Sequence, residues 1–190
     1  MLIQRQILLR LIFLAVLAPL PCASQTVFTS IPPQAFVVEW LAGDLVTVEI
    51  LLPPGASPAT YEPTPKQMAA LDRSQLYLQI GAPFEGPVLG KIAELMPDLE
   101  IIDCRQGIDL EPMDGNGHHH GDAAFDPHIW LDPQRMKNVA TTTAAALQLM
   151  LPKSAPRIAD RLVLLLEAID STDQKVAAIL KPHAGRTVLV

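Results

Sequence analysis

The sequence predicts an α/β fold in which a parallel sheet is flanked by helices and is followed by one long helix. Short β-prone apolar runs alternate with helix-like segments, the order that builds parallel sheets. A stripe of apolar residues at helical spacing then continues over residues 156–180. Apolar residues make up 49% of the chain and aromatic residues only 5%, so we expect a core of Leu, Val, Ile and Ala. The net charge of −6 argues against a nucleic-acid-binding surface.

Residues 1–24 have the pattern of a cleaved signal peptide. Two arginines precede an apolar run over residues 11–20, and small residues close it. The run is too short to anchor the chain stably in a bilayer. We therefore expect export to the periplasm, with cleavage after Ala23 or Ser24. Lipidation of Cys22 is the alternative.

Residues 25–155 are expected to form one α/β lobe. Thr64 precedes a proline, which predicts a capped helix that begins at Pro65. The single thiol of this lobe, Cys104, lacks a CxxC context, so we interpret it as a small buried apolar residue. The other elements follow from periodicity and turn residues: strands over 26–30, 45–52, 76–80 and 99–103, and helices over 33–41, 84–96 and 136–150.

The segment 111–124 interrupts the alternation of strands and helices. It has almost no apolar content and contains three consecutive histidines, His118, His119 and His120, so we expect a surface loop. The triplet is a candidate for an auxiliary zinc site. We expect its zinc affinity to be weak, because adjacent residues on one loop cannot all face one ion without strain. A solvated polar loop without a metal is the alternative.

The C-terminal part of the chain predicts a linking helix and the start of a second lobe. Residues 156–182 form the expected long linking helix, and Pro and Gly then end it. Residues 183–190 enter a β-prone apolar run, which we interpret as the start of a second α/β lobe. An ordinary C-terminal strand that pairs with the first lobe is the alternative.

The strongest candidate for chemistry is His128, which lies between two Asp-Pro dipeptides in the segment 126–133. A neutral imidazole is a good ligand for zinc and similar ions, and a rigid loop lowers the ordering cost of binding. An isolated histidine beside a tryptophan can also be a packing residue, and the spacing alone leaves both interpretations open.

Segment 126–133 and the loop at 52–65 resemble the metal-binding motifs of the zinc- and manganese-binding solute-binding proteins of ABC transporters, the ZnuA/TroA-like family. The histidine-rich loop and the long helix are also similar to features of that family. The resemblance implies two α/β lobes that hold a divalent metal between them, zinc first and manganese second. It also implies delivery of that metal to a membrane permease, and we expect the chain to be a monomer.

The chain departs from the family pattern at one position. Ala59 stands where the family has its first histidine ligand, and a methyl group cannot coordinate a metal. Of the family's ligands, only His128 is present, so we expect metal capture to be impaired. A degenerate product without transport activity is one alternative. A zinc hydrolase is another, but the sequence has no HExxH motif and no second histidine at helical spacing from His128.

Overall fold

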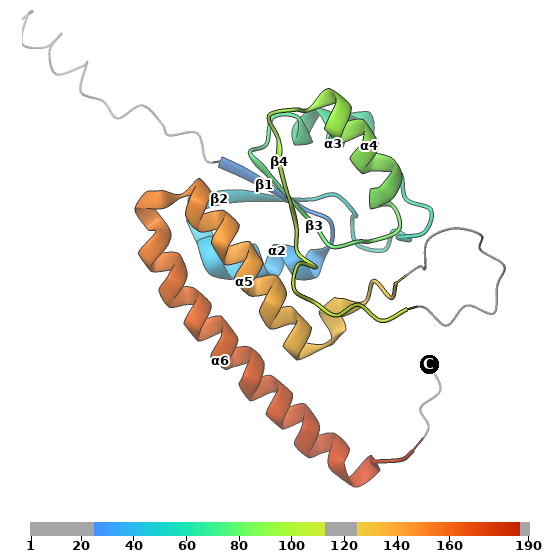
Figure 1. Ribbon diagram of the computed structural model, residues 1–190, viewed down its shortest axis with the longest axis vertical. Coiled ribbons are helices and arrows are strands. Elements are labelled where there is room, and N and C mark those ends of the chain that lie inside the picture. Colours follow the sequence, from blue (N-terminus) through green and yellow to red (C-terminus); the bar gives the residue numbers. More distant parts are fainter. Residues whose placement is uncertain (1–24, 113–124, 187–190) are drawn as a thin grey trace, which may run out of the picture.

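The computed structural model describes residues 25–112 and 125–186. Their centre is a four-stranded parallel sheet in the order β2-β1-β3-β4 (Figure 1). The predicted parallel sheet is therefore confirmed. Its strands are β1 (Gln25–Thr29), β2 (Val46–Ile50), β3 (Leu76–Gln79) and β4 (Glu100–Asp103).

Five α-helices of the described residues cover the two faces of this sheet. Figure 1 shows α3 and α4 on one face and α2, α5 and α6 on the other. The pair α5 and α6 packs together, and both contact α2. The helices are α2 (Pro32–Ala42), α3 (Pro65–Leu71), α4 (Glu85–Leu95), α5 (Pro133–Met150) and α6 (Ala155–Leu180).

Strand β1 lies inside the sheet and is buried on both faces. Val27, Phe28 and Thr29 are at most 1% exposed, and they pair with β2 on one side and β3 on the other. Continuous burial is typical of a parallel strand with helices on both faces. The edge strand β2 alternates instead, with Val46 buried and Thr47 exposed.

Two helix starts follow from capping residues. The Thr64 hydroxyl accepts a hydrogen bond from the Gln67 backbone N–H at 3.3 Å, and Pro65 is the first helical residue of α3, as predicted. The start of α5 was predicted three residues too late. The Asp132 carboxylate accepts from the Gln134 N–H at 2.8 Å, so the helix begins at Pro133.

The long helix α6 belongs to the lobe over its first half only. Ile158 and Leu165 are buried, whereas nearly every residue from position 171 onward is exposed. Arg161 ties α6 to the end of α2, since its Nη1 donates to the Trp40 and Leu41 carbonyl oxygens at 3.4 and 3.3 Å. The second half extends away from the sheet (Figure 1).

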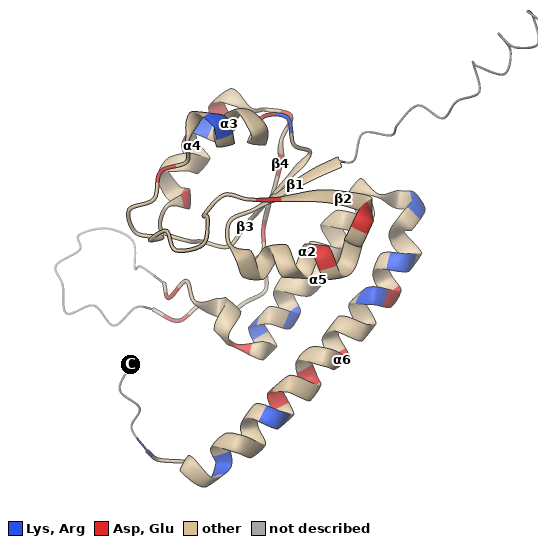
Figure 2. Cartoon of the chain, turned by 180° about the vertical axis from the view of Figure 1, so that it is seen from behind, with Lys and Arg blue, Asp and Glu red and all other residues tan. Residues whose placement is uncertain are grey.

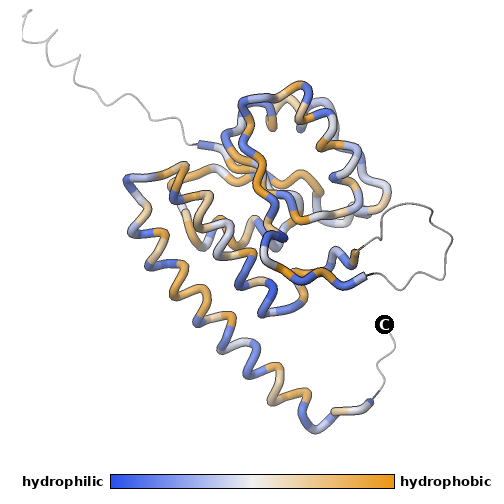
Figure 3. Tube along the Cα trace, viewed as in Figure 1, coloured by the Kyte–Doolittle hydropathy of each residue, from blue (hydrophilic) through white to orange (hydrophobic). Residues whose placement is uncertain are grey.

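Along α6, acidic and basic residues are interspersed (Figure 2), and apolar residues alternate with polar ones (Figure 3). Over residues 25–112 and 125–186, no helix is long and apolar enough to cross a membrane. Some predicted features lie outside these residues: the signal peptide at 1–24, residues 113–124 of the expected surface loop with its triplet His118 to His120, and the last four residues of the expected second-lobe start at 183–190.

Candidate metal-binding site

His128 lies on a short segment that is anchored at both ends. Before it, Phe125 forms an antiparallel bridge with Pro112. After it, Ile129 is fully buried and opens the short 3-10 turn Ile129–Leu131, which leads directly into α5. Figure 1 shows this segment and the loop after β2 on the side of the sheet where the strands end. Parallel sheets commonly bind ligands at that edge.

The imidazole of His128 is oriented by Asp126. The Oδ1 of Asp126 accepts from the His128 backbone N–H at 2.9 Å and lies 2.6 Å from the ring Nδ1. With the Nδ1 proton donated to this carboxylate, the lone pair that a metal needs is on Nε2. The His128 side chain is 56% exposed, so the ring is accessible.

The electrostatics of the pair favour an ionised carboxylate. The backbone N–H of His128, followed by its ring, holds the pKa of Asp126 below its usual value. The Trp130 ring lies 5.1 Å from the imidazole, centroid to centroid, and gives it an apolar neighbour. The sequence predicted His128 as a candidate ligand but not the orienting role of Asp126, although the acid stands only two residues before the histidine.

A single imidazole does not complete a metal site. In the described part of the chain, no group of three or more His, Cys, Asp or Glu side chains is placed to hold a metal ion. A closed zinc site needs four donors, so a zinc ion at His128 would require donors from other residues.

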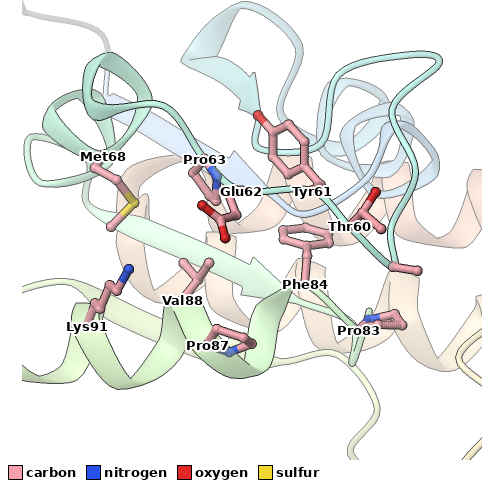
Figure 4. Close-up of a pocket in the computed structure, with 11 residues that line it drawn as sticks. Thr60, Tyr61, Glu62, Pro63, Met68, Pro83, Phe84, Pro87, Val88 and Lys91 are labelled. Carbon is pink, nitrogen blue, oxygen red and sulfur yellow. The ribbon is translucent and has the colours of Figure 1, made fainter.

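Ala59 lies on the loop between β2 and α3, where it lines a cavity of about 220 Å³ (Figure 4). Glu62, which offers a carboxylate oxygen, lines the same cavity. Neither His128 nor Asp126 belongs to the lining. The structure therefore does not bring Ala59 and His128 together in one cavity.

A buried polar cluster behind this edge was not predicted. The Glu85 carboxylate is 1% exposed and accepts from the backbone N–H groups of Ile80 and Gly81 at 2.9 and 2.6 Å. Ser30 donates to it and also bonds the Tyr77 hydroxyl. Burial raises the pKa of Glu85, and burial followed by the Glu85 charge raises the pKa of Tyr77. The cluster ties the ends of β1 and β3 to the start of α4.

Cys104 is fully buried, as the sequence predicted. Burial is the main cause that raises the pKa of its thiol to about 12. A metal requires the thiolate form, so this side chain is a poor ligand at neutral pH.

Comparison with known proteins places these features in a family. The model of the family ZnuA, described as the periplasmic component A of a zinc-uptake complex, matches residues 27–190. A "Putative metal-binding protein" of Chlamydia muridarum is 30% identical over 164 residues, which are 86% of this chain and 57% of that protein. The "High-affinity zinc uptake system protein ZnuA" of Yersinia pestis is 26% identical over 90% of this chain and 61% of its own length.

Solved structures agree with this result. A crystal structure of ZnuA superimposes with a TM-score of 0.76 at 35% identity, over 84% of this chain and 61% of that one. A zinc-bound deletion mutant of ZnuA gives a TM-score of 0.77 at 36% identity, over 84% and 59%. The chain thus spans about three fifths of the length of the relatives that it matches.

Proposed function

The chain belongs to the ZnuA family of periplasmic zinc-uptake components, and from this premise we propose that it forms the first lobe of a binding protein that captures a divalent transition metal. Zinc is the first choice and manganese the second, since the relatives include zinc-uptake proteins and a manganese-binding lipoprotein of Halalkalibacterium halodurans. The captured ion is passed to the permease of an ABC transporter. The family consists of metal-binding transport proteins and not of enzymes, which removes the zinc-hydrolase alternative.

The observation that carries this proposal is the pair formed by Asp126 and His128. A carboxylate that orients a metal-binding histidine through its second ring nitrogen is the usual arrangement around protein-bound zinc. Here the carboxylate holds both the backbone and the ring of the same histidine, while the ring remains accessible. A packing histidine would bury this ring instead of presenting it.

Ala59 weakens this capture in our proposal. The position lies on an exposed loop at the edge of the sheet where His128 is found, and its methyl group adds no donor. The free energy of zinc binding by these residues alone should then fall well short of the ~10–16 kcal/mol that a complete structural zinc site provides. A degenerate product without transport activity would bind no more zinc at His128 than at any exposed histidine.

We also propose that the protein acts outside the cytoplasm. The residues before β1 carry the signal pattern described above, and the family is one of periplasmic components. Lipidated relatives such as AdcA of Streptococcus pneumoniae are described as zinc-binding lipoproteins, which keeps a lipid anchor at Cys22 as the alternative.

Calorimetric titration with zinc at neutral pH tests the metal proposal. The parent for this comparison has His118, His119 and His120 replaced by Ser, so that the triplet does not contribute. His128→Ala should then remove the measurable zinc-binding heat. His183→Ala, a change at an exposed histidine after α6, is the matched control and should leave it unchanged. Equal titrations of all three proteins would refute a role of His128.

A further inference from the structure

The cavity between residues 59–63 and α4 has a charged end and an apolar end. Figure 4 shows the Glu62 carboxylate and the Lys91 ammonium on either side of Val88, with the Phe84 ring farther along. Phe84 is 3% and Val88 6% exposed, so the floor of the cavity is continuous with the hydrophobic core. An apolar floor with a few convergent polar groups is the usual composition of a small-molecule site.

Both walls of the cavity are held in place by contacts of the protein itself. On the loop side, the Tyr61 ring stands edge-on to Phe84 at 5.6 Å, and its hydroxyl donates to Gln67 Oε1 at 2.7 Å. Gln67 in turn donates to the Leu51 carbonyl at 2.8 Å. On the helix side, the buried Glu85 fixes the start of α4. A preformed site has little ordering cost left when a ligand enters it.

The two charges at the rim lack partners within the described residues. Glu62 and Lys91 take part in none of the hydrogen bonds or ion pairs found there, whereas Lys137 is paired with Asp170 at 2.7 Å. Opposite charges on opposite walls do not favour a simple anion or a simple cation. They are complementary to a molecule that carries both an ammonium and a carboxylate group.

The size of the cavity sets the class of ligand. Its volume of about 220 Å³ equals that of about seven water molecules at ~30 Å³ each. It is smaller than the ~300–1,000 Å³ of sites for drug-sized molecules. A single amino acid matches this volume, and its side chain would occupy the apolar end.

We propose that this cavity binds a free α-amino acid with an apolar side chain, with its ammonium on Glu62, its carboxylate on Lys91 and its side chain between Val88 and Phe84. His128 and Asp126 do not line this cavity, although Ala59 does. The test is made with metal chelated, so that its outcome does not depend on zinc binding.

The first test compares three ligands on the full chain in the presence of EDTA. Leucine is titrated by calorimetry alongside 4-methylpentanoate, which lacks the ammonium, and 3-methylbutylamine, which lacks the carboxylate. Each analogue should bind about tenfold more weakly, the effect of losing one hydrogen bond to a charged group. The proposal is refuted if leucine does not bind, or if either analogue binds as tightly as leucine.

The second test removes each charge of the protein in turn. Glu62→Gln and Lys91→Met should each weaken leucine binding about tenfold. Glu62→Gln should leave the binding of 4-methylpentanoate unchanged, because that ligand has no ammonium group to contact Glu62. The matched controls, Glu94→Gln and Lys66→Met, change exposed charges outside the lining and should have no effect. Equal losses in variants and controls would mean that only net charge matters and would overturn the assignment.

Discussion

Replacing Asp126 with Ala should weaken zinc binding about tenfold without unfolding the protein. The substitution removes the carboxylate that lies 2.6 Å from the His128 Nδ1 and 2.9 Å from its backbone nitrogen. Orienting partners of metal-binding histidines are worth about 10–100-fold in affinity. We expect the lower end of that range, because the His128 and Asp126 side chains are 56% and 48% exposed and water replaces part of the lost hydrogen bonding. Tenfold corresponds to about 1.4 kcal/mol.

A second substitution separates orientation from charge. Asp126→Asn keeps an oxygen that can accept both hydrogen bonds but removes the negative charge. If orientation dominates, zinc affinity should stay close to that of the parent, whereas a charge effect would make Asn as weak as Ala.

The assay is competitive titration of zinc against a chromophoric chelator, in the background that has the histidine triplet replaced by Ser. Asp98→Ala provides the matched control, since it removes one exposed acid and so the same formal charge. The reasoning is refuted if Asp126→Ala binds zinc like its parent while His128→Ala does not bind it.

Three further outcomes are expected. Ala59→His should strengthen zinc binding in the same background, by a few kcal/mol at most and well below the ~10–16 kcal/mol of a complete structural site, and an unchanged calorimetric titration would contradict a place for this position in the site. N-terminal sequencing of periplasmic material should begin close to Ser24 or Gln25, and an unprocessed chain recovered from the cytoplasm would count against export. In urea denaturation, Ile158→Ala should lower the free energy of unfolding by about 2–5 kcal/mol, because this α6 side chain is fully buried. Val176→Ala, on the exposed half of the same helix, should change it by less than ~0.5 kcal/mol, and equal losses would mean that the whole helix belongs to the core.

Most of the fold could be predicted because it depends on local patterns. The alternation of apolar runs and helical periods predicted the four strands and five α-helices of the described residues to within a few residues. The largest error was the start of α5, where the Asp132 carboxylate caps the helix and Pro133 is its first residue. A capping acid followed by proline is itself a sequence signal, but here it lay within a motif that we had interpreted as a metal-binding loop.

The candidate site could be predicted only in part. His128 could be named because its neighbours in the chain, two Asp-Pro dipeptides, limit the backbone on both sides. The buried contact of Ser30 with Glu85, 55 positions apart in the chain, left no pattern to detect. The same is true of the cavity between Glu62 and Lys91, whose walls come from a loop and a helix of different α/β units.

The sequence by itself determined the order of the elements and the parallel sheet, and it indicated His128 as a candidate ligand, because each depends on residues that are near neighbours along the chain. The tertiary structure decided which side chains meet across elements: Arg161 on the end of α2, and Ser30 after β1 on Glu85 at the start of α4. Such contacts depend on the packing of helices on a twisted sheet. Packing is a property of the whole lobe, so the spacing of residues within a single segment does not encode it.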